Sequence, residues 1–185
     1  VRRQRQMCIR DSVKDELGLS DTTVYLNVSA HTIMHQEFCK IFSKFVEEND
    51  IKENEFGLEI TETAELEDTQ KAGESLERLK KRGIKIALDD FGAGYASLKY
   101  IRDLPIDVVK LDRHFTSNIS DPSTSRLIKF VSDVCAELNL EMIGEGIETE
   151  QEKNMMIDLG CETGQGFLMH MPSFIEDIMK EKNDG

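Results

Sequence analysis

Two adjacent carboxylates, Asp89 and Asp90, are the residues whose types and spacing most clearly indicate chemistry. They follow the apolar run Ile84–Leu88, which has the length and composition of a buried strand, and a glycine-containing loop comes after them. Neighbouring carboxylates repel each other unless a cation or a shared proton relieves the repulsion. The pair therefore predicts a metal site at the end of a strand.

Polar side chains also stand at the ends of the other strand-like runs. In α/β proteins, functional groups gather at the carboxyl ends of the strands. Each residue alone has an ordinary structural explanation: Glu62 can begin a helix, where acidic residues are favoured, and Lys110 can be a salt-bridged strand lysine. Together they predict one shared site. The residues, in chain order, are Asn27, Glu59, Glu62, Lys110, Asp112, Glu145, Glu148 and Gln165.

The types of these side chains indicate which metal the site would bind. Carboxylate and amide oxygens suit Mg²⁺, Mn²⁺ or Ca²⁺, and the four histidines show no zinc spacing. An aspartate that bridges two ions about 4 Å apart suits in-line attack on a phosphodiester, and Lys110 would then hold or help deprotonate the attacking water. From the residues alone, an enolase-like proton-abstracting enzyme or a Schiff-base aldolase stays open.

Composition limits the class of protein further. The chain has 185 residues, 39% of them hydrophobic, and a net charge of −13. This charge argues against DNA or RNA binding, which needs a basic surface. A small phosphorylated ligand remains compatible because a bound cation reverses the local field. The sequence shows no membrane-spanning run and no signal peptide. Four scattered cysteines favour a reduced, cytoplasmic setting.

The first residues differ from the rest in composition. Four of the 23 Lys and Arg residues fall within the first ten positions, and the chain does not begin with Met. We therefore expect residues 1–12 to be a non-native or disordered leader and residues 13–185 to form one domain.

Strand-length apolar runs alternate with stretches of helical period. This alternation predicts an α/β fold with a parallel sheet. About six strands are visible, fewer than the eight of a complete barrel. The two interpretations are an open doubly wound sheet and a TIM-like (β/α)₈ barrel that is incomplete because its N-terminal part is missing. The expected strands are 23–28, 56–60, 84–88, 106–111, 141–144 and about 166–169.

Six segments in this order resemble the EAL domain, a bacterial phosphodiesterase of cyclic di-GMP. The resemblance covers about residues 23–172 and implies a TIM-like barrel that hydrolyses cyclic di-GMP to linear pGpG with Mg²⁺ or Mn²⁺. The matching segments are Leu26–Ser29, Leu58–Glu62, Asp89–Tyr95, Leu104–Asp112, Gly144–Thr149 and Gly164–Phe167.

The resemblance also implies a role for each matching residue. One metal would be held by Asn27, Glu59 and Asp89. The second would be held by Asp89 and Asp90, with Glu145 close to it.

The remaining matches concern the water, the substrate and a loop. Lys110 would position the attacking water, and Gln165 would lie near that water and the substrate. Asp112 is expected to bind substrate. Glu62 would anchor the loop 91–98, which is implicated in dimerisation within the family.

This sequence departs from the family pattern at two places. The glutamate-alanine-leucine tripeptide of the first strand is absent, and Gly144 replaces the usual alanine. We expect the parent protein to be an active phosphodiesterase that has sensory or diguanylate-cyclase domains upstream and can form a homodimer. The 185-residue chain itself is expected to be impaired in hydrolysis. The alternative is a module that binds cyclic di-GMP or a protein without hydrolysis.

Overall fold

Six parallel strands form a single sheet whose spatial order follows the chain. The computed structural model describes residues 22–49, 51–61, 68–93, 97–174 and 177. The strands pair in the order β1-β2-β3-β4-β5-β6, and every pairing is parallel. A doubly wound sheet reverses its strand order at a switch point; this sheet does not. The strands are β1 Val24–Asn27, β2 Phe56–Thr61, β3 Lys85–Phe91, β4 Val108–Leu111, β5 Glu141–Gly144 and β6 Thr163–Gly164.

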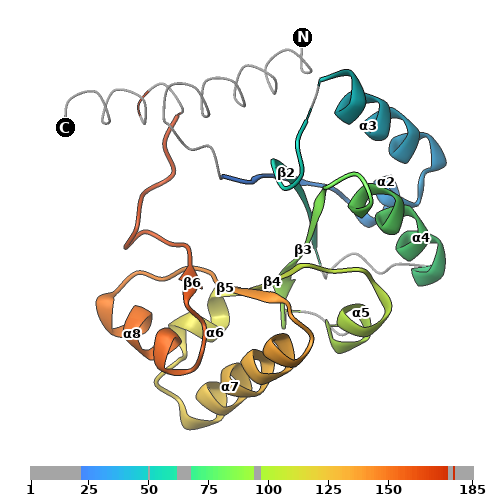
Figure 1. Ribbon diagram of the computed structural model, residues 1–185. Helices are drawn as coiled ribbons and strands as arrows, with labels where there is room; N and C mark the ends of the chain where they lie inside the picture. The colour runs from blue at the N-terminus through green and yellow to red at the C-terminus, as the bar shows by residue number, and fades with distance from the viewer. Residues whose placement is uncertain (1–21, 50, 62–67, 94–96, 175–176, 178–185) are drawn as a thin grey trace.

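The sheet curls into part of a barrel, and helices cover its convex side (Figure 1). The fold is therefore the incomplete TIM-like barrel that the strand pattern allowed. The helices are α2 Ala30–Met34, α3 Gln36–Glu48, α4 Thr69–Lys80, α5 Ser97–Asp103, α6 Arg113–Ser117, α7 Pro122–Glu137 and α8 Glu150–Asp158. None of the helices in the described segments is long and apolar enough to cross a bilayer.

The core lies between the strands and the helices that cover them. Leu58 and Ile86 on neighbouring strands are fully buried, as are Leu76 and Leu79 of α4. Apolar residues from α4 recur at helical spacing, so one face of the helix packs on the sheet while the other stays in solvent. This packing fixes the strands rigidly and so fixes the residues at their carboxyl ends.

Capping residues set where the later helices begin, as the sequence predicts. Asp121 accepts hydrogen bonds from the backbone amides of Ser123 and Thr124, at 3.1 and 2.9 Å, and Pro122 follows at the first helical position. Thr149 and Glu152 form a capping box at the start of α8. The first of these helices follows α6, and the second follows the loop after β5.

Two expected elements differ in the structure, and one helix was not expected. The helical pattern around Met34 is broken at His35, whose extended backbone separates α2 from α3. The last strand is Thr163–Gly164 and not residues 166–169, because the Gly166 carbonyl accepts from the amides of Met169 and His170 and so closes a turn. The short helix α6 was not predicted.

The third strand was also expected to end before the aspartate pair. Instead β3 continues through both aspartates to Phe91, which pairs with Leu111 of β4. The carboxylates thus belong to the sheet itself and not to the loop that follows it.

Candidate active site

A β-bulge aims both aspartates at the same place. Leu88 pairs with Val109 and Phe91 pairs with Leu111, so Asp89 and Asp90 together oppose a single residue of β4. Successive residues of a regular strand point to opposite faces, but an extra residue reorients one of them. Asp90 accordingly has a left-handed backbone, with φ of 55°. The bulge was not predicted, and the only trace of it in the sequence is the pair itself.

The reoriented pair forms an acidic cluster with Glu145, which follows β5. Asp89, Asp90 and Glu145 each offer a carboxylate oxygen, and these oxygens lie within 4.8 Å of one another. Strands β4 and β5 lie between the aspartate pair and Glu145 in the chain, so the cluster exists only because the parallel strands end at a common edge.

The residue opposite the bulge is Lys110, which lies at the centre of the carboxylates. Its ammonium Nζ is 2.9 Å from Glu59, 2.8 Å from Asp89 and 2.8 Å from Glu145. The lysine side chain is only 7% exposed. Four neighbouring strands or strand ends therefore meet through this one side chain, as the expectation of a shared site requires.

Burial and ion pairing act in opposite directions on these groups. Burial disfavours the charged ammonium, but hydrogen bonds to Asp89, Glu145 and Glu59 outweigh it and raise the pKa of Lys110. Burial raises the pKa of Glu145, and Lys110 opposes that rise. Lys110 is therefore a cation and hydrogen-bond donor to the three carboxylates in this structure.

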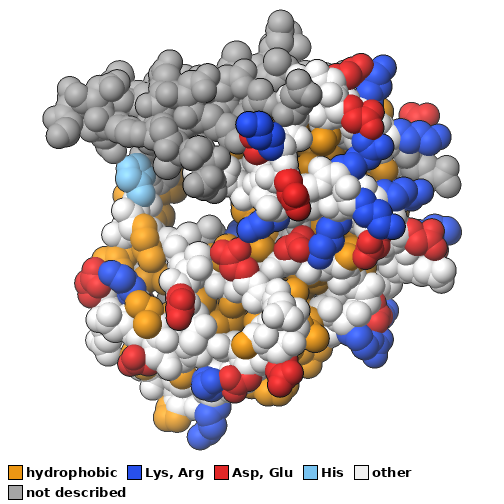
Figure 2. All heavy atoms as spheres, in the orientation of Figure 1, with side chains coloured by type: hydrophobic (Ala, Val, Ile, Leu, Met, Phe, Trp, Pro, Cys, Tyr) orange, Lys and Arg blue, Asp and Glu red, His pale blue; other side chains and the backbone are white. Residues whose placement is uncertain are grey.

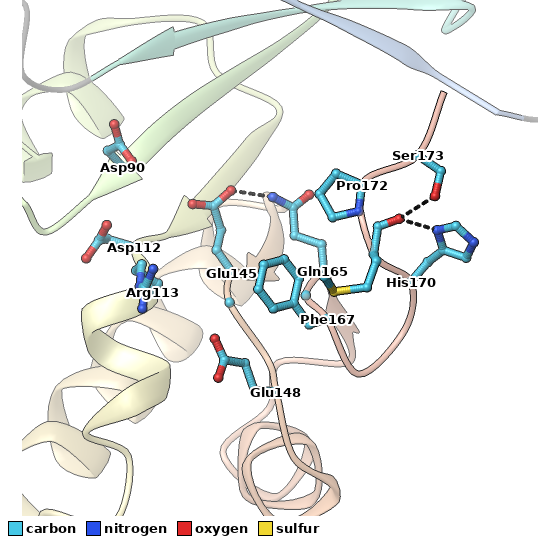
Figure 3. A pocket seen from close by; sticks show the side chains of 13 residues that line it. Asp90, Asp112, Arg113, Glu145, Glu148, Gln165, Phe167, His170, Pro172 and Ser173 are labelled. Atoms are coloured by element: carbon cyan, nitrogen blue, oxygen red, sulfur yellow. Dashed lines mark hydrogen bonds between the residues drawn. The ribbon is translucent and has the colours of Figure 1, made fainter. Parts of the chain in front are cut away.

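Gln165, after the short strand β6, orients Glu145. Its Nε2 donates a hydrogen bond of 2.6 Å to Oε1 of Glu145 (Figure 3). The same oxygen of Glu145 faces Lys110. The amide and the ammonium thus hold the Glu145 carboxylate together.

These residues border a pocket of about 610 Å³ at the carboxyl edge of the sheet. Figure 2 shows the hollow, with acidic side chains around its opening. Among the residues that the structure describes, the lining carries four carboxylates, from Asp90, Asp112, Glu145 and Glu148, against a single arginine. Phe167, Met171 and Pro172 supply an apolar wall. The pocket can accept a flat apolar group, but an anionic ligand needs cations to offset the carboxylates.

The other predicted residues occupy varied positions. Asn27 is the register partner of Glu59 on the neighbouring strand and is exposed. Asp112 lines the pocket and also caps α6, where it accepts a 2.8 Å hydrogen bond from the His114 amide. Glu62 lies outside the described residues.

The sequence reasoning missed several residues of the pocket lining, of which two bear most directly on ligand binding. Arg113 directly follows Asp112 at the end of β4, and Phe167 follows Gln165 by two positions; both line the pocket. Their adjacency to predicted site residues was the available signal. Arg113 brings a positive charge, and Phe167 brings a flat surface that a ring can stack on.

The donor set fits a hard divalent cation. The clustered ligand atoms are carboxylate oxygens on rigid strands, the type that Mg²⁺ and Mn²⁺ prefer. With two adjacent aspartates, Asp89 could be a ligand of two ions while Asp90 is a ligand of only one of them. The structure therefore supplies oxygen ligands for divalent metal in the place that the adjacent aspartates predicted.

Comparisons with known proteins agree with this architecture. The model of the EAL domain family matches residues 5–172. The crystal structure of the EAL domain of Mycobacterium smegmatis DcpA superposes with a TM-score of 0.88 at 27% identity, over 98% of this chain and 82% of that one. The chain belongs to the EAL domain family.

Two proteins of Pseudomonas aeruginosa are similar in sequence. The cyclic di-GMP phosphodiesterase PA2567 is 33% identical over 154 residues, which are 83% of this chain and 26% of that protein. MucR, a bifunctional diguanylate cyclase/cyclic di-GMP phosphodiesterase, is 30% identical over 163 residues, 88% of this chain and 24% of MucR. The chain thus spans about a quarter of the length of these curated relatives.

A structure of the PaMucR phosphodiesterase in complex with c-di-GMP is also similar. It has a TM-score of 0.83 and 29% identity, and the match covers 94% of this chain and 70% of that one.

Proposed function

We propose that cyclic di-GMP binds in the pocket beside the aspartate pair and is hydrolysed to linear pGpG in the longer parent protein, and that the 185-residue chain itself carries out this hydrolysis in impaired form. The observation that carries the proposal is the cluster of Asp89, Asp90 and Glu145 at the edge of a pocket lined mostly by carboxylates. A phosphodiester is an anion, so such a lining suits it only when cations are bound between the two. The similarity to named cyclic di-GMP phosphodiesterases supports the choice of substrate.

Each residue receives a role that its contacts support. Asn27, Glu59 and Asp89 would hold one divalent ion, Mg²⁺ or Mn²⁺, and Asp89 and Asp90 would hold a second. Bound ions would supply an activated water and offset the charge of the phosphodiester. Lys110, a buried cation, would hold the attacking water by hydrogen bonding.

The pocket wall would orient the substrate. Gln165 would keep Glu145 in place through their 2.6 Å hydrogen bond. Arg113 and Asp112 lie where they can meet polar groups of the ligand, and Phe167 offers a surface for a guanine ring. The same proposal includes homodimerisation and control by cyclase or sensory domains of a longer protein. The bifunctional relative MucR supports the presence of a cyclase domain in such a protein.

Turnover of cyclic di-GMP, followed by chromatographic separation of pGpG, tests the proposal. We expect product with Mn²⁺ and none after chelation by EDTA. Asp89→Asn should lower turnover by roughly 100-fold or more, because even changes behind a metal's ligands cost about 10–100-fold. Asp133→Asn is the matched control, since Asp133 is exposed on α7 and pairs with Lys129.

Two results would count against the proposal in different ways. Unchanged turnover by Asp89→Asn would refute the metal role of this residue. Tight binding of cyclic di-GMP without any pGpG, with Mn²⁺ present, would favour a module that binds the dinucleotide without hydrolysis.

A further inference from the structure

The contacts of Lys110 use the whole hydrogen-bonding capacity of its ammonium group. An ammonium has three N–H donors, and Nζ lies 2.8 to 2.9 Å from oxygens of three different carboxylates. The side chains of all four groups are at most 15% exposed. A donor is therefore not left over for a water or a phosphate while these three contacts persist.

The partners of Lys110 overlap with the candidate metal ligands. Asp89 and Glu145 contact Lys110, and both belong to the acidic cluster that also contains Asp90. Glu59, the third partner of Lys110, is the register neighbour of Asn27. Lys110 and a divalent cation therefore compete for the same carboxylate groups.

We propose that Lys110 is the internal counter-ion of the metal-free site, and that a divalent cation displaces its ammonium from at least one carboxylate. Buried carboxylates without a counter-charge are strongly disfavoured, so Lys110 keeps the cluster assembled before metal binds. The inference rests on the proposed function, because it concerns the same metal site.

This exchange links metal binding to the role of the lysine. A contact that Lys110 gives up to metal frees one N–H donor of its ammonium group. Lys110 can then donate to the attacking water or to a phosphate oxygen. Lys110 thus becomes available to substrate only in the metal-bound site. An anionic ligand therefore cannot pair with Lys110 before the metal has bound.

Mn²⁺ affinity, measured by electron paramagnetic resonance and calorimetry without substrate, tests the competition. Lys110→Met removes the charge with little change of length, and we expect Mn²⁺ to bind at least tenfold more tightly. Lys110→Arg keeps the charge and should show no such gain. Lys80→Met is a second control, because Lys80 pairs with Asp107 away from the cluster. Equal or weaker Mn²⁺ binding by Lys110→Met would overturn the inference.

Thermal unfolding gives a second readout of the same variant. Without metal, Lys110→Met should unfold at a lower temperature than the unaltered chain. Mn²⁺ should raise the unfolding temperature of Lys110→Met by more than it raises that of the unaltered chain. An equal rise in both proteins would contradict the competition.

A measurement on the unaltered chain keeps the inference testable if Lys110→Met does not fold. In protein labelled with ¹⁵N-lysine, Mg²⁺ should shift the Nζ signal of Lys110 and speed its hydrogen exchange, while the Lys80 signal stays fixed. The Lys110 signal is assigned by its loss in Lys110→Arg. An unperturbed Lys110 signal under saturating Mg²⁺ would refute displacement and leave the proposed function standing. If the unaltered chain bound neither Mn²⁺ nor Mg²⁺, both this inference and the proposed function would be refuted.

Discussion

The ammonium of Lys110 lies 2.8 Å from the Asp89 carboxylate, at the point where β3 places two residues opposite one residue of β4. The bulge and the ion pair depend on each other. The extra residue turns Asp90 toward the cluster, and the added negative charge at one edge of the sheet is offset by the lysine across the bulge. The site is therefore a property of two neighbouring strands and not of one loop.

Gln165→Ala should reduce turnover by roughly 10–100-fold, the usual cost of losing a group that orients a metal-site residue. The reason is the 2.6 Å hydrogen bond by which the amide holds Glu145. Steady-state rates at saturating Mn²⁺ measure the effect. Gln165→Glu should be at least as damaging, because it places a second carboxylate against Glu145. Full activity in Gln165→Ala would show that Glu145 needs no such support.

Two glycines at the carboxyl edge should respond differently to alanine. A Cβ on Gly166 would lie 2.2 Å from the carbonyl oxygen of Ile147, and rigid backbone cannot give way. We expect Gly166→Ala to lose roughly 1–3 kcal/mol or more of unfolding free energy. A Cβ on Gly144 would meet the methyl end of Met156, which can rotate aside. Gly144→Ala should therefore lose clearly less in urea unfolding; equal losses would contradict this account.

One tyrosine should ionise late. Burial, reinforced by Glu141 and Glu59, raises the pKa of Tyr25 to about 12. An ultraviolet titration should show one phenol ionising near that pH, and Tyr25→Phe should remove it. Because the unfolded chain releases this proton near its ordinary pKa of about 10, the native state binds more protons between pH 10 and 12. Stability from Tyr25 is thus complete below pH 10 and is lost as pH rises through 12.

The matched comparison for this pH dependence is the phenylalanine variant. The unaltered chain should lose on the order of 2 kcal/mol more unfolding free energy between pH 10 and 12 than Tyr25→Phe does. Identical slopes in the two proteins would show that Tyr25 is not protected from ionisation.

Three described cysteines should resist alkylation in the folded protein. Cys39, Cys135 and Cys161 are free thiols with at most 5% exposure. Burial raises the pKa of Cys135 and of Cys161 to about 11, and the thiolate is the reactive form. In a Cys8→Ser background at pH 8, we expect iodoacetamide to label them slowly before denaturation and fully after it. Fast labelling of the native protein would contradict the packing described.

The sequence predicted the parallel sheet and the shared edge because strand patterning and strand-end polarity are local signals. Glu59, Lys110 and Glu145 stand on or beside three separate apolar runs, and parallel pairing brings their ends together. Their mutual contacts could not be predicted, because one lysine can pair with any of several carboxylates at that edge.

The differences between prediction and structure come from tertiary contacts. The path of β3 through the aspartates depends on Phe91 pairing with Leu111, which is invisible in a local pattern. The apolar residues after Gly166 resembled a strand, but their backbone closes a turn and places Phe167 against the pocket. Local patterning thus located the site's strands and not the details of its rim.

The bulge in β3 also sets how this domain can tolerate change in chain length. Removing either residue of the Asp89–Asp90 pair would restore regular pairing with β4 and leave β3 with only one of its two carboxylates at the site. A substitution there alters one ligand, whereas a deletion alters the direction of the strand that carries both. Engineering of this segment should therefore exchange side chains and preserve the residue count.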